Sequence, residues 1–264
     1  MKQPHQTKKK GTVPVYEYLS EALGLGLFMV SAGLVATALD SPVSPLHEWI
    51  GSADLRRVLA GIAMGLTAIG LIYSPWGKRS GAHMNPAVTL GFLWLGKIRP
   101  RDAMGYIAAQ FIGGLVGVLL VAGLLGDAFA APPVSFAATV PGMAGVLAAF
   151  IAELVISFGM LFIILRVAAH PRHASRAGWV AGGLVALYIS VEAPLSGMSM
   201  NPARSFASAA PAALWHHLWI YFIAPPLGMC LAAAAFRWRE GKAALCAKLV
   251  HDANTPCIHC GHQP

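Results

Sequence analysis

Long apolar stretches alternate with short polar segments along almost the whole chain. A helix needs about 20 mostly apolar residues to cross a bilayer, and six stretches reach that length. We expect spanning helices at about residues 15–38, 55–74, 102–125, 145–168, 178–194 and 216–237. The first stretch lacks an Ala-x-Ala cleavage site, so we interpret it as a retained helix and not as a signal peptide. The pattern predicts an all-α integral membrane protein.

Two further apolar stretches, near residues 86–95 and 202–211, are about half as long as a spanning helix. Each begins at an Asn-Pro-Ala triplet, Asn85-Pro86-Ala87 or Asn201-Pro202-Ala203. Asparagine caps helix N-termini and proline is favoured at the first helical position, so each triplet predicts a helix start. A half-length helix is tolerated at membrane depth only where it is buried in protein or lines a wet cavity. We therefore expect two re-entrant half-helices around a site at the midplane.

The order of these segments repeats in the two halves of the chain, about 15–125 and 145–238. In each half an acidic residue, Glu21 or Glu153, stands near the start of the first helix, and the half-helix lies between the second and third helices. Three spans per half is an odd number, so the second half is inverted relative to the first. The two half-helices then enter from opposite sides and meet at their N-termini.

Composition and charge support a membrane protein and give its orientation. Hydrophobic residues make up 56% of the chain and charged residues 11%, whereas a soluble domain carries about 25% charged residues. The net charge of +8 does not indicate a nucleic-acid partner, because the basic residues flank the apolar stretches. All lysines and arginines except Arg56, Arg57 and Arg204 fall on the side that holds both termini in this topology. This bias places both termini in the cytoplasm. We expect the chain in the cell (inner or plasma) membrane.

Two facing helix N-termini have a direct chemical consequence. Each carries an effective charge of about +0.5 from its aligned peptide dipoles, so cations, including hydronium, are repelled there. The side-chain oxygens of Asn85 and Asn201 can cap their own helices while the NH2 groups face the lumen. A water that accepts hydrogen bonds from both asparagines points its hydrogens away from them and cannot easily relay a proton. The motifs predict a pore for uncharged solutes.

At these motifs the chain resembles a known family. The strings Ser80-Gly81-Ala82-His83-Met84-Asn85-Pro86-Ala87-Val88-Thr89 and Met198-Ser199-Met200-Asn201-Pro202-Ala203-Arg204-Ser205 are similar to the two signature loops of the aquaporin, or major intrinsic protein, family. The resemblance covers about residues 15–238 and includes Glu21, Glu153 and Tyr106-Ile107-Ala108-Ala109-Gln110. It implies a channel domain with six tilted helices, two half-helices and one pore per subunit, in a homotetramer. We expect no cofactor, and we expect no enzymatic activity because no nucleophile, metal or acid–base cluster converges outside the pore. The remaining segments, 1–14 and 239–264, are expected to be cytoplasmic tails.

The resemblance also implies roles for single residues. Glu21 and Glu153 are expected to accept hydrogen bonds from the re-entrant loops, a structural role and not a gating role. Gln110 would satisfy loop groups in a similar way. Arg204 follows the second triplet and would belong to the outer selectivity filter, although a snorkelling arginine is the bland alternative. His83 would line the pore, or bond to loop backbone, or do both.

Alignment on the motifs gives a filter that differs from those of typical members. Its residues are Met64, Ile189, Met198 and Arg204. Gly65 is the alternative to Met64, because the loop at 74–84 is one residue longer than usual. Typical water channels place an aromatic residue and a histidine here, and glycerol channels place two aromatics, whereas Ile189 and the methionines are apolar. Ser205 and the Tyr221-Phe222 pair nevertheless resemble water-type members.

These features predict a passive channel for water, with some permeability to ammonia, hydrogen peroxide or glycerol. A channel mainly for such neutral solutes, with low water flux, is the alternative. A secondary transporter is less favoured, because the midplane offers Asn85 and Asn201 and no free acid pair. A scaffolding or adhesion protein of this family, with a closed pore, is also less favoured, because the short outer loops offer little adhesive surface.

Two features remain outside this picture. Glu192 lies three residues after Ile189 near the outer mouth, where it could pair with an arginine, attract cations or be a solvated residue. The tail Cys257-Ile258-His259-Cys260-Gly261-His262 contains metal-ligand residue types. One Cys-x-x-Cys is only half of a zinc site. We therefore interpret this segment as a reduced, disordered tail and expect no metal.

Overall fold

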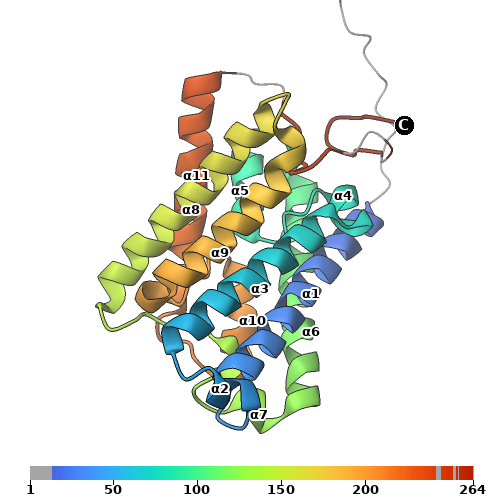
Figure 1. Ribbon diagram of the computed structural model, residues 1–264. Coiled ribbons are helices and arrows are strands. Elements are labelled where there is room, and N and C mark those ends of the chain that lie inside the picture. The colour runs from blue at the N-terminus through green and yellow to red at the C-terminus, as the bar shows by residue number, and fades with distance from the viewer. Residues whose placement is uncertain (1–13, 242–244, 252–253, 255, 264) are drawn as a thin grey trace, which may run out of the picture.

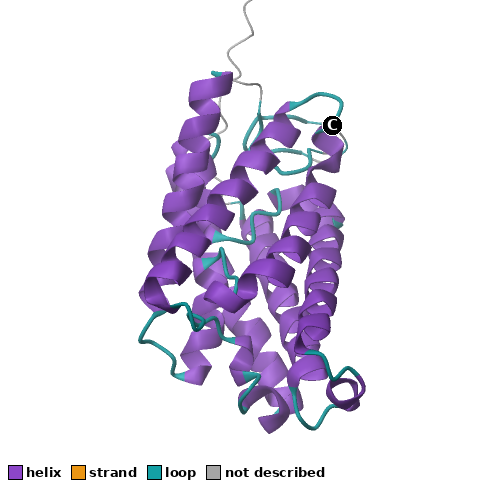
Figure 2. Cartoon of the chain, turned by 60° about the vertical axis from the view of Figure 1, so that its left-hand side comes forward, coloured by secondary structure: helices purple, strands orange, loops and turns teal. Residues whose placement is uncertain are grey.

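Six long helices follow the six apolar stretches of the sequence. They are α1 (Val15–Asp40), α3 (Ala53–Tyr73), α6 (Pro100–Leu125), α8 (Gly145–Ala169), α9 (Ala177–Ser196) and α11 (Leu218–Glu240). All six are long and apolar enough to cross a membrane. The structure is a computed structural model that describes residues 14–241, 245–251, 254 and 256–263. Within these residues every regular element is helical (Figure 2), as the hydropathy pattern predicted.

Two half-helices, α5 (Pro86–Trp94) and α10 (Pro202–Ala212), lie inside the bundle. With 9 and 11 residues, they are about 14 and 16 Å long, roughly half of the hydrocarbon core. They occupy opposite halves of the bundle, α5 near the end that holds the C-terminus and α10 near the other end (Figure 1). The prediction of two re-entrant half-helices in an inverted repeat is confirmed.

The pairing of the long helices follows the repeat. Helix α1 packs on α6, and α8 packs on α11 in the same way in the second half, while α3 packs on α9 and joins the halves. Glycines permit these close approaches. A Cβ atom at Gly61 would lie 2.6 Å from the Ala186 carbonyl oxygen, and one at Gly113 would collide with the Ala22 carbonyl. Small residues thus let the helix backbones pack closely in lipid, where the hydrophobic effect does not drive helix association.

The short elements mark the two ends of the bundle. Helices α2 (Pro45–Trp49) and α7 (Asp127–Ala130) lie at the bottom of Figure 1, and the turn η1 (Ser135–Ala137) contacts α7. We call this end the loop side. Helix α4 (Pro75–Ser80) lies at the opposite end, beside the start of α1 and the C-terminus. We call that end the terminal side. The turn η2 (Ala174–Arg176) joins α8 to α9 there.

The outer surface of the bundle is apolar. Large apolar side chains on several helices are exposed. For example, Leu120 is 63% exposed and Leu147 is 72% exposed. A soluble protein rarely exposes apolar patches of this extent to water, whereas lipid tails are as apolar as these side chains and can cover them. The chain is therefore an integral, multi-pass membrane protein.

Candidate pore

The two loops that precede the half-helices have the same unusual backbone. Gly81 and Gly197 end the preceding helices at φ 105° and 79°. Ala82 and Met84 follow with positive φ values of 55° and 47°, and Met198 and Met200 repeat them at 50° and 54°. Residues other than glycine are rarely left-handed, and several in a row persist only where their surroundings hold them. Each loop therefore needs external support for its backbone.

Glu21 supplies that support in the first half. The N–H groups of His83 and Met84 donate to its two carboxylate oxygens, at 3.0 and 2.5 Å, and Gln110 Nε2 donates at 2.7 Å. The side chain of Glu21 is fully buried. A carboxylate in this position satisfies donors that would otherwise be orphaned at membrane depth. Gln110 also donates to Thr89, so it supports the loop through two side chains and not through loop backbone.

Glu153 does the same in the second half. Its oxygens accept from the N–H groups of Ser199 and Met200, both at 2.7 Å, and from the Ser196 hydroxyl at 2.7 Å. Its side chain is also fully buried. The two acids thus hold equivalent loops by equivalent bonds, which is the placement expected of a structural role.

A tyrosine and a serine complete each support, a role that the sequence motifs did not assign to them. Tyr106 donates to the Ser80 carbonyl at 2.6 Å, and Tyr221 donates to the Ser196 carbonyl at 2.5 Å. The Ser80 and Ser196 hydroxyls each accept from the backbone N–H two residues later, at 3.1 Å. Only the serines have a signal in the sequence: both loops begin with Ser-Gly, and the serine lies four residues before the Met that precedes the triplet.

The two triplets meet, and each asparagine bonds across the meeting point. Asn85 Oδ1 accepts from the Ala87 N–H at 2.8 Å, so the side chain caps its own helix. Asn85 Nδ2 donates to the Met200 carbonyl at 2.7 Å. In the same way Asn201 Oδ1 accepts from Ala203 and Arg204, and Asn201 Nδ2 donates to the Met84 carbonyl at 2.8 Å. Each NH2 group has two hydrogens, so one remains for a solute.

A cavity of about 140 Å³ lies along both asparagines. A water takes about 30 Å³ in the liquid, so a short file of waters fits. The polar side chains on its wall are His83, Asn85, Ser199, Asn201 and Arg204. No acidic side chain lines it among the residues the structure describes. Methionine and aliphatic side chains form most of the remaining wall.

The structure brings all four expected filter residues to this cavity. Met64, Ile189, Met198 and Arg204 all line it. Gly65 instead faces α9, where a Cβ atom would lie 2.6 Å from the Gly182 carbonyl oxygen. The rotation of α3, which its packing on α9 sets, therefore selects Met64 over Gly65.

Glu192 is buried in the bundle, and Arg204 is partly buried. Nη1 of Arg204 is buried and has no hydrogen-bond partner among the described residues, although the side chain lines the cavity. Glu192 is 6% exposed, and its two carboxylate oxygens have no partner in the described part of the chain. The interpretation of Glu192 as a solvated residue is therefore wrong, because the bundle covers it.

His83 lies on the cavity wall near the terminal side and uses both ring nitrogens. Nε2 donates to the Ala247 carbonyl at 2.7 Å, and Nδ1 lies 3.1 Å from the Thr89 hydroxyl. The ring stacks on Phe92 with centroids 4.8 Å apart. His259 stacks parallel to it at 6.4 Å, and burial lowers the pKa of His259 to about 4, so that ring is neutral at neutral pH.

A pore of this construction, with two capped half-helices meeting at paired asparagines, defines a class of membrane channel. The chain matches the family described as Major intrinsic protein over residues 9–236. This chain belongs to that family, the aquaporins. Its members are passive channels, so the protein is a channel for water or small solutes and not an enzyme.

Similar proteins agree with this assignment. Aquaporin NIP1-2 of Arabidopsis thaliana is 34% identical over 82% of this chain and 72% of its own length. Aquaporin TIP4-4 of Zea mays is 34% identical over 71% of this chain and 78% of its own length. An X-ray structure of the aquaglyceroporin from Plasmodium falciparum superimposes with a TM-score of 0.69, covering 84% of this chain and 95% of that one. At 22% identity this last likeness shows the fold alone.

Proposed function

We propose that this channel conducts water and small uncharged solutes and excludes protons and ions. The observation that carries the proposal is the cavity that joins Asn85, Asn201 and Arg204 without an acidic side chain among its described lining residues. A cation in that cavity would meet two helix N-termini and a guanidinium and no counter-charge. A secondary transporter would need an ionisable pair there to couple an ion.

Proton exclusion follows from the bonds of the two asparagines. One hydrogen of each NH2 group is held by a carbonyl of the opposite loop, so the direction of the other hydrogen is fixed. A water that accepts from Asn85 and Asn201 turns its own hydrogens outward along the pore. The chain of waters is then oriented in opposite senses on the two sides, which interrupts proton relay.

The filter supports a wider choice of solutes than water alone. Arg204 offers a donor, while Met64, Ile189 and Met198 offer only apolar contact. Neutral molecules such as ammonia, hydrogen peroxide or glycerol carry no charge that an apolar wall would leave unsolvated, and the guanidinium offers them hydrogen bonds. Methionine side chains adapt to different shapes. The alternative, a channel mainly for such solutes with low water flux, rests on this same apolar wall.

Stopped-flow light scattering of proteoliposomes tests the proposal. We expect osmotic water permeability well above that of empty vesicles, and solute flux that rises linearly with concentration. The full chain and the Leu249→Ala variant should both be measured, since Leu249 lies on the cavity wall at the terminal side. Permeability no higher than that of empty vesicles in both proteins would overturn water conduction. Saturable flux would indicate a carrier.

We also propose that the terminal side faces the cytoplasm, that the channel lies in the cell membrane and that it forms a homotetramer. The excess of lysine and arginine on the terminal side supports the orientation. Protease access to a C-terminal tag in sealed cells tests it, because digestion from outside would contradict a cytoplasmic tail. Light scattering of the detergent-purified protein tests the tetramer.

A further inference from the structure

The C-terminal segment folds against the terminal-side mouth of the pore. The described residues Leu245, Ala247, Leu249 and Val250 are all buried. The expectation of a disordered tail is therefore wrong for the described residues, since these apolar side chains dock on the channel. None of the described residues in 245–263 belongs to a helix or strand, so some other interaction must fix their path.

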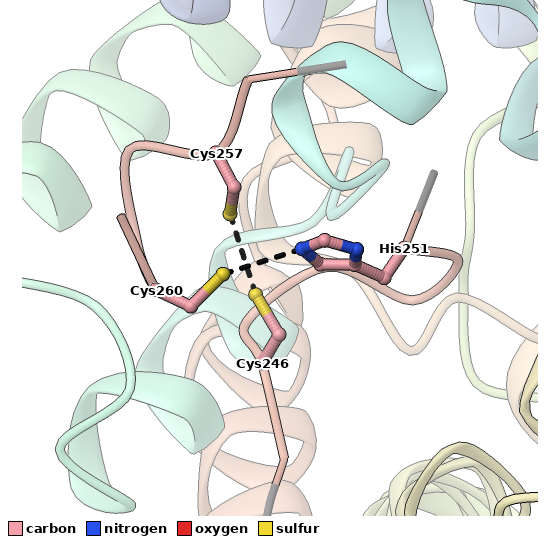
Figure 3. Close-up of side chains that lie close together, drawn as sticks. All are labelled: Cys246, His251, Cys257 and Cys260. Carbon is pink, nitrogen blue, oxygen red and sulfur yellow. Dashed lines mark hydrogen bonds between the residues drawn. The ribbon is translucent and has the colours of Figure 1, made fainter. Parts of the chain in front are cut away.

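Four side chains of this segment converge on one point (Figure 3). They are Cys246, His251, Cys257 and Cys260. Cys246 Sγ lies 3.4 Å from Cys257 Sγ, and His251 Nε2 lies 3.2 Å from Cys260 Sγ. All four candidate ligand atoms lie within 4.8 Å of one another. The Cys-x-x-Cys found in the sequence is thus joined by a second pair from the preceding loop.

These distances suit a tetrahedral metal ion. Zinc bonds of about 2.3 Å to sulfur and about 2.0–2.1 Å to nitrogen place tetrahedral ligand atoms about 3.6–3.8 Å apart. Three thiolates and one imidazole form a common structural zinc set, and soft thiolates select zinc over harder divalent ions. We propose that Cys246, His251, Cys257 and Cys260 bind one Zn²⁺ ion, which fixes the C-terminal segment across the terminal-side mouth of the pore.

The surroundings of the cluster favour a metal over a disulfide. A Cys246–Cys257 disulfide would leave His251 and Cys260 beside it without a role, and on a cytoplasmic side it would be kept reduced. The backbone already holds the Cys-x-x-Cys pair in a turn: Gly261 N–H donates to the Cys257 carbonyl at 3.0 Å. His251 and Cys260 are exposed, so an ion has a path of entry.

The residues beside the proposed ligands make the contacts with the pore. Ala247, next to Cys246, accepts the hydrogen bond from His83. Leu249 donates its N–H to the Gly81 carbonyl at 3.1 Å and lines the pore cavity. His259, between Cys257 and Cys260, places Nε2 3.3 Å from the Tyr106 hydroxyl. The proposed site and the pore loop are therefore linked on both sides of the metal.

In this arrangement the bound metal regulates water flux through the channel. This consequence rests on the proposed function. With Zn²⁺ bound, the segment occupies the mouth and takes the hydrogen bond that His83 would otherwise offer to water. Without Zn²⁺, the segment loses most of the free energy that fixes its path, because binding energy of a structural zinc is folding energy. Water flux should then rise several-fold.

Metal analysis tests the site without reference to transport. The full chain, purified in reductant without a polyhistidine tag and supplied with Zn²⁺, should contain about one zinc per chain by mass spectrometry. Co²⁺ in its place should give the absorption of a tetrahedral thiolate site. Cys257→Ser and His251→Ala should reduce the zinc content strongly. Cys230→Ser is the matched control, because Cys230 lies in α11 outside the cluster.

Three results would overturn the site: no zinc in the supplied wild-type protein, equal zinc content in Cys257→Ser and Cys230→Ser, or Cys246 and Cys257 found as a disulfide in protein prepared without reductant. A different metal at full occupancy would overturn the choice of ion.

Stopped-flow measurements of water permeability test whether zinc regulates the channel. A membrane-permeable zinc chelator should raise the water permeability of wild-type and Cys230→Ser proteoliposomes several-fold and leave Cys257→Ser, already high, unchanged. If zinc is bound and flux is high but the chelator has no effect, regulation by zinc is overturned and the zinc site is not. Flux at the level of empty vesicles in every variant, with zinc bound to the wild-type protein, would overturn the proposed function and leave the site standing.

Discussion

The two re-entrant loops share one scaffold but carry different chemistry. In both, a buried glutamate, a tyrosine and a serine hold the backbone through equivalent bonds. The lumen-facing positions differ. His83 of the first loop corresponds to Ser199 of the second, and Val88 corresponds to Arg204. Ser199 bonds to Ser205 at 2.6 Å inside its own half, whereas His83 bonds to the C-terminal segment.

This difference separates what the fold requires from what selectivity requires. Both loops need the same acceptors, because both hold left-handed residues and unpaired N–H groups at membrane depth. Only one end of the pore needs a fixed positive charge, and only one end meets the C-terminal segment. The repeat therefore duplicates the support and leaves the lining free to diverge.

The largest expected effect comes from breaking the shared support. Glu21→Gln and Glu153→Gln each replace one acceptor oxygen with an NH2 group that faces a backbone N–H. A buried donor left without its acceptor costs about 1–3 kcal/mol, and more when a charged group is lost. Both variants should melt well below wild type in detergent, and by similar amounts. Glu48→Gln, at an exposed position in α2, is the control; a normal melting temperature for either buried variant would contradict equivalence.

Making the second loop resemble the first should change selectivity. Arg204→Val removes the charge and donors at the filter and copies Val88. We expect glycerol permeability and proton leak, read with a pH dye inside vesicles, to rise several-fold. Water flux should change less. Arg166→Val is the matched control, since Arg166 pairs with Glu240 at a partly exposed site away from the cavity lining. Unchanged proton leak in Arg204→Val would show that the helix ends suffice.

Removing one hydrogen bond from each support should have a smaller and equal effect. Tyr106→Phe and Tyr221→Phe each delete one bond to a serine carbonyl, which is worth about 1 kcal/mol. Thermal unfolding should show a modest decrease for both. Tyr16→Phe, at an exposed ring, controls for the loss of a hydroxyl. A decrease in only one variant would mean that the halves are not held alike.

The smallest expected effect comes from making the first loop resemble the second. His83→Ser removes the bond to Ala247 but leaves the Leu249–Gly81 bond and the metal ligands in place. One bond of about 1 kcal/mol is lost, while the remaining contacts still hold the segment, so water permeability should rise only modestly. Zinc content should stay at the wild-type level. Lower zinc content would show that the pore loop helps to build the metal site.

Local patterns were sufficient to predict most of the fold. The spans and half-helices were expected within a few residues of their bounds, because hydropathy and the Asn-Pro caps act over a few turns. Helix α11 begins at Leu218, two residues after the expected start, because Ala213 adopts φ 54° and a turn precedes the helix. Non-local contacts were harder. Tyr106 and Tyr221 lie 26 and 25 residues from the serines they hold, and no local pattern reports such a bond.

The sequence by itself determined the number of spans, the inversion of the second half and the pairing of Asn85 with Asn201. These features depend on apolar length and on helix caps, which neighbouring residues set. Only the tertiary structure decided that Met64 and not Gly65 faces the cavity, because the packing of α3 on α9 sets its rotation. Only the tertiary structure brought Cys246 and His251 to the Cys257–Cys260 pair, because chain folding and not spacing joins the two loops.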